Sequence, residues 1–143
     1  MILIDANLLI YAFDSSSPHH RSARPWLDEQ LCGSSTVGIP WETIAAFLRI
    51  VTNPRIYPGA ITMAGAWEQM EAWLQSDAVW IPLPSERQAT LFGELLRVPG
   101  LRANDVPDVH LAALAISHGL ILCSADAGFA RFPGLRWTNP LTT

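Results

Sequence analysis

Short apolar runs alternate along this chain with longer stretches in which apolar residues recur every three or four positions. The short runs have the length of buried strands, and the longer stretches have the periodicity of helices with one apolar face. The runs that predict strands are residues 2–5, 36–39, 79–81, 120–123 and 135–137. The stretches that predict helices are residues 8–13, 19–31, 40–51, 62–75, 85–97 and 106–118. This alternation predicts an α/β fold, with a central parallel sheet of four to five short strands wrapped by helices.

Proline, glycine and capping residues indicate where several of these helices begin and end. Pro40 suits the first turn of the third helix, and Gly119 ends the last one. Ser85 and Gln88 have the spacing of a capping box, which predicts that the fifth helix starts at Ser85. Pro25 predicts that the second helix is bent or begins late, because proline interrupts helical hydrogen bonding.

The composition fits one globular domain over residues 1–143. Half of the residues are apolar, and no apolar run approaches the roughly 18 residues of a membrane-spanning helix. The chain starts with a strand-like run that lacks the regions of a secretory signal. Cys32 and Cys123 form no motif, and Cys123 lies in an apolar run, as a buried free thiol would. We therefore expect a cytoplasmic protein that does not contact a membrane.

The charge balance gives no clear indication of nucleic-acid binding. The formal net charge is −4, and every basic residue is an arginine, because the chain contains no lysine. Arginine can bind phosphate through two parallel hydrogen bonds, so RNA remains a possible ligand. A coding bias towards GC-rich codons is the simpler explanation for the absence of lysine.

Four acidic residues lie where predicted strands end or predicted helices begin. Asp5 and Asp126 follow the first and fourth strands, and Glu42 and Asp108 lie in the first turns of their helices. The carboxyl ends of parallel strands meet at one edge of a sheet, where ligands usually bind. Four carboxylates at one edge repel each other unless a cation lies among them, and hard divalent cations prefer oxygen ligands. This pattern predicts a metal-dependent phosphodiester hydrolase.

Each acidic residue also has an ordinary structural explanation. Asp5 and Asp105 are well placed to cap helices, with capping the main role of Asp105, and glutamate favours the first turn of a helix. Asp126 lies in the turn-like sequence Ser-Ala-Asp-Ala-Gly. We favour a metal site because all four candidate acids fall on the same expected edge.

Two polar residues accompany the acids at the strand ends. Asn7 lies two residues after Asp5, and Ser124 lies two residues before Asp126. On an extended backbone, residues two apart point to the same side. Asn7 and Ser124 are therefore expected to support the carboxylates, through an amide oxygen or a hydroxyl group.

The chain resembles the PIN-domain ribonucleases of the VapC toxin type, from bacterial toxin–antitoxin pairs. Four segments in this order carry the resemblance: IDANLLIYA at 4–12, WETIAAFLRI at 41–50, NDVPDVHLAALA at 104–115 and SADAGFARFPGLRW at 124–137. The resemblance covers nearly the whole chain and implies a PIN fold. It also implies that four catalytic acids bind one or two Mg²⁺ or Mn²⁺ ions, namely Asp5, Glu42, Asp108 and Asp126.

The resemblance further implies an activity and partners. The expected activity is endoribonucleolytic cleavage of tRNA or rRNA that leaves a 5′-phosphate and a 3′-hydroxyl. The expected partners are a cognate VapB-type antitoxin, which presents an arginine to the acidic crevice, and a second copy of the chain in a homodimer. Gly128 departs from the family, which often has a further acid there.

Basic residues and histidines complete the candidate chemistry. Phosphate contacts are expected from arginines near the acids, namely Arg49, Arg55, Arg102 and Arg131. No histidine is needed as a general base, and His110 and His118 are expected on the exposed side of their helix.

Other enzymes and non-enzymatic binding domains are alternatives to this interpretation. Phosphatases of the haloacid dehalogenase type and response-regulator receivers also begin with a strand that ends in aspartate, but both depend on a lysine that this chain lacks. A catalytically weak PIN domain that binds RNA or a protein partner remains an alternative. A plain interaction domain, in which the acids only cap helices, is the other alternative.

Overall fold

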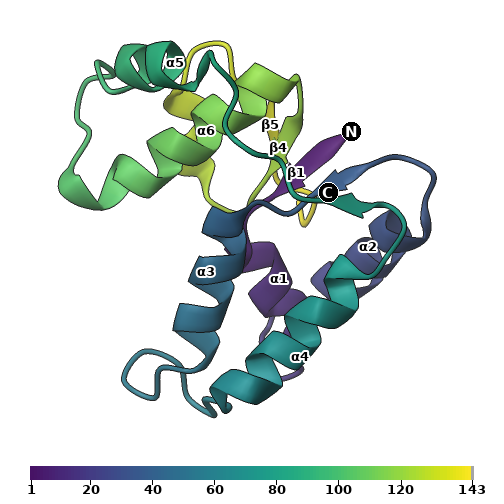
Figure 1. The fold of residues 1–143 in the computed structure, drawn as a ribbon. Helices are drawn as coiled ribbons and strands as arrows, with labels where there is room; N and C mark the ends of the chain where they lie inside the picture. Colours follow the sequence, from purple (N-terminus) through teal and green to yellow (C-terminus); the bar gives the residue numbers. More distant parts are fainter. Residues whose placement is uncertain (143) are drawn as a thin grey trace.

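The short apolar runs pair into one parallel sheet in the computed structural model, which describes residues 1–142 (Figure 1). The sheet has five strands in the order β3-β2-β1-β4-β5, and each neighbouring pair is parallel. The strands are β1 (Ile2–Ile4), β2 (Val37–Gly38), β3 (Val79–Trp80), β4 (Ile121–Cys123) and β5 (Trp137–Thr138). The predicted parallel sheet is confirmed. Residue 143, the last of the expected domain, lies outside the described residues.

Six α-helices connect the strands, and each lies within a few residues of its predicted range. They are α1 (Ala6–Phe13), α2 (His20–Cys32), α3 (Trp41–Val51), α4 (Met63–Leu74), α5 (Gln88–Leu95) and α6 (Val106–His118). Two short 3₁₀ turns, η1 (Ala103–Asp105) and η2 (Ala127–Arg131), flank α6 and β4 in the chain. None of the helices in residues 1–142 is long and apolar enough to cross a membrane.

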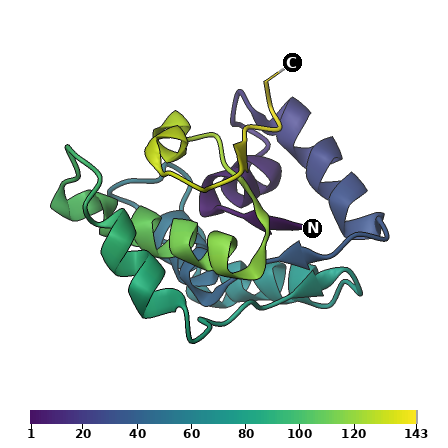
Figure 2. The same cartoon turned by 90° about the horizontal axis from the view of Figure 1, so that it is seen from above.

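The helices form two layers, one on each face of the sheet (Figures 1 and 2). Alternate residues of the central strands point to opposite faces. Ile4 of β1 and Cys123 of β4 belong to the buried cluster formed with helices α1 to α4. Leu3 and Leu122, their neighbours in the chain, belong to the cluster formed with α5 and α6. The strands are apolar on both faces because both faces are covered, as is usual in parallel sheets.

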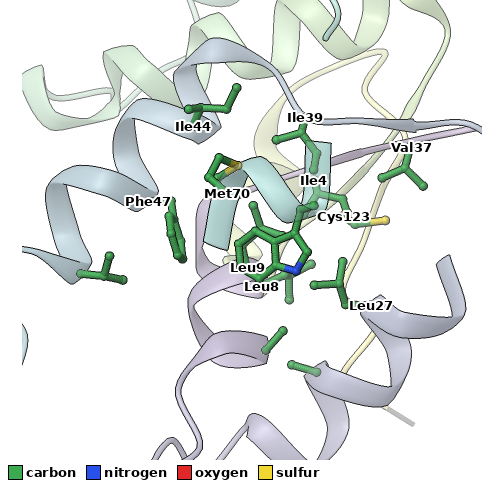
Figure 3. Packing of buried hydrophobic residues seen from close by; sticks show 14 of the residues in the cluster. Ile4, Leu8, Leu9, Leu27, Val37, Ile39, Ile44, Phe47, Met70 and Cys123 are labelled. Atoms are coloured by element: carbon green, nitrogen blue, oxygen red, sulfur yellow. The ribbon is translucent and has the colours of Figure 1, made fainter. Parts of the chain in front are cut away.

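Aliphatic side chains make up most of the larger cluster, which is shown in Figure 3, and aromatic rings pack among them. Phe47 of α3 is fully buried, and its ring packs edge-on against Trp73 of α4 at 5.1 Å and against Phe13 of α1 at 5.7 Å. Edge-to-face pairs at such distances add to the stabilisation from apolar burial. These contacts fix α3 against α1 and α4, and so fix the position of the residues at the start of α3.

The start of α5 and the course of α2 differ from the prediction. The predicted capping box is wrong, because α5 begins at Gln88, three residues after Ser85. The Gln88 side chain is only 8% exposed and makes hydrogen bonds inside the protein instead of capping the helix. For α2, where Pro25 predicted a bend or a late start, the late start is wrong, because α2 begins at His20 and runs through Pro25.

The strand order places a crevice at the carboxyl ends of β1 and β4. From β1 the chain continues to β2 and β3 on one side, whereas β4 and β5 lie on the other side. Ligands in open α/β sheets bind where the strand order reverses in this way. The amide of Asp5 donates to the carbonyl of Cys123 at 3.0 Å, so the two strand ends are in register. The Thr43 hydroxyl of α3 donates to the carbonyl of Ile4 at 2.8 Å.

The bond from Thr43 to Ile4 predicts a measurable contribution to stability. Thr43 is 2% exposed, and Thr43→Val keeps the shape of the side chain but removes the donor from a buried carbonyl. The free energy of unfolding should fall by about 1–3 kcal/mol, measured by urea denaturation. Thr52→Val is the control. The Thr52 hydroxyl, at the end of the same helix, donates to the carbonyl of Leu48 at 2.6 Å but is only partly buried. A loss for Thr52→Val as large as that for Thr43→Val would contradict this expectation.

Candidate active site

A cavity of about 290 Å³ opens beside the carboxyl end of β1. Three of the four candidate acids line it: Asp5 from the end of β1, Glu42 from α3 and Asp108 from α6. The other polar residues that line it are Asn7, Thr43, Arg49 and Asn104, and apolar residues form the remaining wall. The two helix layers and the central strand therefore each contribute one carboxylate to the same cavity.

Asp5 is held by hydrogen bonds to both of its carboxylate oxygens. Oδ1 accepts from the amide of Ala6 at 2.8 Å, and Oδ2 accepts from the Ser124 hydroxyl at 2.8 Å. Burial raises the pKa of Asp5 above its ordinary value, the bonds from Ser124 and Ala6 lower it, and the charge of Asp126 raises it. Asp5 thus caps α1, as its ordinary explanation holds, and also lines the cavity.

Asn7 and Ser124 join the end of β1 to the loop after β4. The Asn7 amide donates to the Ser124 hydroxyl at 3.0 Å, and its Oδ1 accepts from the amide of Ala125 at 3.2 Å. The Ser124 hydroxyl, which is fully buried, also accepts from the amide of Asp126 at 3.0 Å. Asn7 lies in the first turn of α1 and not on extended backbone, so the reason given for its orientation is wrong, although it does contact Asp5, at 3.4 Å.

Asp108 has the most perturbed carboxyl group of the cavity. It lies in the first turn of α6, whose residues Ala112 and Ala115 are fully buried. The pKa of Asp108 is raised to about 6, chiefly by burial and then by the charges of Asp5 and Asp126. Arg131 opposes this shift, with a guanidinium nitrogen 4.0 Å from Asp108. Asp108 therefore lies in an excess of negative charge that the protein only partly offsets.

Asp105 has a structural role different from the predicted one. It occupies the N-cap position of α6 but makes no side-chain cap bond to that helix. Its carboxylate accepts from the amide of Arg102 at 2.8 Å and pairs with Arg131 at 3.1 Å. These contacts, led by the Arg102 amide, lower the pKa of Asp105. The Asp105 carboxylate therefore caps the η1 turn, which precedes α6, instead of α6 itself.

Asp126 is exposed and is not among the residues that line the cavity. Its Oδ1 accepts from the amide of Gly128 at 2.8 Å, so it also caps η2, as the turn explanation holds. Its charge nevertheless raises the pKa of both Asp5 and Asp108. A Cβ atom at position 128 would lie 3.0 Å from this Oδ1, so any side chain there would require Asp126 to shift slightly.

Glu42 is bonded to a histidine that the periodicity assigned to the exposed side of α6. Nε2 of His110 lies 2.8 Å from Oε1 of Glu42, and the His110 side chain is 27% exposed. The expectation of an exposed His110 without a role in the site is therefore wrong. The second oxygen, Oε2 of Glu42, is buried and has no hydrogen-bond partner in the described residues. One sequence signal could have found this contact, because α6 is apolar all round and a polar residue in such a helix needs a partner.

The candidate arginines do not all lie at the cavity. Arg49 lines it and forms no ion pair with any described side chain. Arg55 and Arg102 are exposed and are not among the lining residues. Arg131 is engaged with Asp105 and Asp108 and packs over the ring of Phe132. Arg49 is thus the best placed of the four to meet a phosphate.

The donor set of this cavity fits a hard divalent cation. It offers carboxylate oxygens, one buried Glu42 oxygen without a partner, and an Asp108 pKa raised partly by neighbouring acids. A divalent cation would bind the Glu42 oxygen that has no partner and would offset the negative charge around Asp108. Within residues 1–142, no three His, Cys, Asp or Glu side chains yet converge closely enough to enclose an ion. Binding of an ion by three of these side chains would therefore require them to move closer together.

Comparison with known proteins places the chain in a family. The sequence model of the PIN domain matches residues 2–135. The chain is 37% identical to Ribonuclease VapC37 of Mycobacterium tuberculosis over 140 residues, which cover 98% of this chain and 97% of the relative.

Solved structures share the fold at lower sequence identity. VapBC2 from Rickettsia felis, bound to a DNA fragment from their promoter, matches with a TM-score of 0.71 and 21% identity, over 97% of this chain and 98% of that chain. A toxin–antitoxin complex from Klebsiella pneumoniae matches with a TM-score of 0.65 and 20% identity, over 98% of each chain. The chain belongs to the PIN domain family, and within it to the VapC ribonuclease toxins of toxin–antitoxin systems.

The raised pKa of Asp108 predicts that the metal-free protein loses stability as the pH rises. Its pKa is about 6 in the folded protein, against an ordinary value of 3.8, so the folded state binds this proton more tightly. The destabilisation is absent below about pH 4, develops up to about pH 6 and is complete above it. Asp108→Asn should therefore raise the free energy of unfolding near neutral pH by about 1 kcal/mol, after allowance for solvent screening, and change it little at about pH 4.

Urea denaturation in a chelating buffer at the two pH values measures this difference. Asp77→Asn is the matched control, because Asp77 is exposed in the turn between α4 and β3. A larger stabilisation by Asp108→Asn at the acidic pH than at the neutral pH would show that the carboxyl is not protonated as described.

Proposed function

We propose that this protein is a toxin that cleaves RNA internally by hydrolysing phosphodiester bonds, with Mg²⁺ or Mn²⁺ as its cofactor. The observation that carries the proposal is the cavity that Asp5, Glu42 and Asp108 line and where the negative charge is only partly offset. The relatives named as ribonucleases support the same reaction. A phosphodiester is the fitting substrate because its hydrolysis develops negative charge that a cation can stabilise.

The four acids would hold the ion: Asp5, Glu42, Asp108 and Asp126. When bound, the ion supplies a water of lowered pKa and offsets the charge that builds on the phosphate. Asn7 and Ser124 keep Asp5 pointed at the cavity, because their hydrogen bonds fix its Oδ2 against the loop after β4. The product carries a 5′-phosphate and a 3′-hydroxyl.

The arginines supply the contacts to the RNA backbone in this proposal. Arg49 lies on the cavity wall and has no ion-pair partner among the described residues, so its guanidinium is free to bind a phosphate near the cleaved bond. Arg55 and Arg102 are exposed and would contact the strand further away. Binding through such contacts weakens as salt increases.

The partners follow from the toxin family. The similar structures include VapBC2 and a toxin–antitoxin complex, which supports a cognate VapB-type antitoxin as the inhibitor. Such an inhibitor would place an arginine among the carboxylates and so offset the charge that the cavity leaves uncompensated. A homodimer, a cytoplasmic location and a tRNA or rRNA target complete the proposal, with one PIN domain over residues 1–143.

Asp5→Asn is expected to reduce RNA cleavage by about a hundredfold or more, since a lost ligand costs at least as much as a lost outer contact. The variant keeps the size of the side chain and can still accept from Ala6, so its fold should remain. Cleavage is measured on total bacterial RNA with protein freed of antitoxin, with and without Mg²⁺ or Mn²⁺. Asp77→Asn is the control and should cleave like the wild type.

The outcome separates the nuclease from its alternative. Cleavage by Asp5→Asn at the wild-type rate would show that the acids at this cavity do not carry the reaction. Folded wild-type protein that binds RNA but cleaves none with any metal would favour the catalytically weak binding module.

Metal binding should also stabilise the folded protein. At a concentration about one hundred times its Kd, Mn²⁺ should add about 2.7 kcal/mol to the free energy of unfolding. Thermal denaturation at increasing Mn²⁺ measures this effect, with Asp108→Asn as the variant that should respond much less. An unchanged melting temperature in the wild type would support the plain interaction domain, in which the acids only cap helices.

A further inference from the structure

We propose that Gln88 and His110 are positioning residues that hold Glu42, so that Oε1 is bonded within the protein and Oε2 is left for the metal ion. This inference rests on the metal-dependent ribonuclease proposed above. The three side chains come from three helices, Gln88 from α5, His110 from α6 and Glu42 from α3. They form one continuous row of hydrogen bonds that ends at the cavity.

The orientation of the Gln88 amide is fixed by a backbone carbonyl. Nε2 of Gln88 lies 3.1 Å from the carbonyl oxygen of His110. A carbonyl oxygen only accepts hydrogen bonds, so the NH₂ group of Gln88, and not its oxygen, must lie there. The second hydrogen of the same NH₂ group is directed to Nδ1 of the His110 ring, at 3.4 Å.

This amide in turn determines which ring nitrogen of His110 carries the proton. Nδ1 faces a donor and therefore acts as an acceptor, so in the neutral ring the hydrogen resides on Nε2. Nε2 lies 2.8 Å from Oε1 of Glu42, which makes it the donor in that bond. The direction of every bond from Gln88 to Glu42 is thus set by the carbonyl of His110.

The surroundings keep the row rigid. Gln88 is 8% exposed, and the edge of the His110 ring packs near Phe92, at 6.2 Å between centroids. Phe92 follows Gln88 by one helical turn on α5, so a single helix supports both the ring and its donor. Few water molecules can reach Gln88 at this exposure, so the protein itself determines its hydrogen bonds.

The Glu42 carboxylate shows what this arrangement achieves. Oε1 is occupied by His110, whereas Oε2 is buried and has no partner in the described residues. A buried carboxylate oxygen without a partner is costly, which points to a ligand that satisfies it. A glutamate side chain has several rotatable bonds, and a fixed Oε1 removes most of its freedom before the ion binds. Outer contacts of this type typically change metal affinity or activity by about 10–100-fold.

The first test reads the tautomer of His110 in the metal-free protein. Long-range ¹H–¹⁵N NMR spectra distinguish a ring protonated on Nε2 from one protonated on Nδ1, and the His110 signals are assigned by their loss in His110→Phe. We expect the Nε2–H tautomer in the wild type and a mixture of tautomers in Gln88→Leu, which removes the donor. A wild-type ring protonated on Nδ1 would overturn the proposal.

The second test measures Mn²⁺ affinity by calorimetric titration and cleavage by steady-state kinetics. His110→Phe, which preserves an aromatic ring, should weaken Mn²⁺ binding by about 10–100-fold and lower kcat with little change in KM. Gln88→Leu, which leaves Glu42 and His110 intact, should show a smaller loss in the same direction. His118→Phe is the matched control on α6, because His118 bonds to the carbonyl of Leu83 at 2.7 Å instead of a candidate ligand; it should match the wild type.

These measurements separate the two proposals. A wild type that binds Mn²⁺ and cleaves RNA, together with a folded His110→Phe variant of equal Mn²⁺ affinity, would overturn the positioning role alone. A wild type that neither binds Mn²⁺ nor cleaves RNA would overturn the proposed function and this inference with it.

Discussion

The parallel pairing of β1 with β4 determines where every other part of the site can lie. This pair lies at the centre of the sheet, where the strand order reverses, and both strands are buried between two helix layers. The cavity lined by three of the candidate acids lies beside the carboxyl end of β1. Asp5 and Ser124 directly follow the two strands, and the hydrogen bond between them ties the chain together across more than a hundred residues. The remaining carboxylates approach this fixed point from the helices.

The carboxylates at this site repel one another. The protein brings Asp5 and Asp108 to one cavity, with Asp126 close enough to act on both, and supplies Arg131 as only a partial counterion. The pKa of Asp108 is raised chiefly by burial, and the charges of Asp5 and Asp126 add to this shift. Protein stability alone would be better served by neutral side chains at these positions, because an unpaired buried charge opposes folding. The metal ion proposed for this cavity would offset that repulsion.

The sequence predicted most of the fold because its signals are local. Short apolar runs between periodic stretches gave the five strands and six helices to within a few residues, and Gly119 marks the end of α6 as expected. The errors arise where a distant contact overrides a local preference. Gln88 was expected to cap its own helix, but it bonds to His110 on another helix. Asp105 was expected to cap α6, but Arg102 and Arg131 hold it in the preceding turn.

The same distinction applies to the site. The positions of the acids along the chain predicted a shared edge, and Asp5, Glu42 and Asp108 do line one cavity, whereas Asp126 lies outside its wall. The bond from His110 to Glu42 spans 68 residues, and helical periodicity places His110 on the side of α6 away from Asp108. That side of α6 faces α5, where Gln88 bonds to the carbonyl of His110, and the His110 ring reaches Glu42 in the first turn of α3. Contacts between layers of this type are not encoded in any short segment.

One feature of the architecture links the chemistry to the cohesion of the whole molecule. Glu42 belongs to the helix layer on one face of the sheet and Asp108 to the layer on the other, and the strands between them are only two or three residues long. A ligand that binds both carboxylates at once would act as a noncovalent crosslink between the two hydrophobic cores. Loss of that ligand would loosen the contact between the layers as well as stop catalysis. For this fold, the strength of the contact between the two layers would then depend on whether the cavity is occupied.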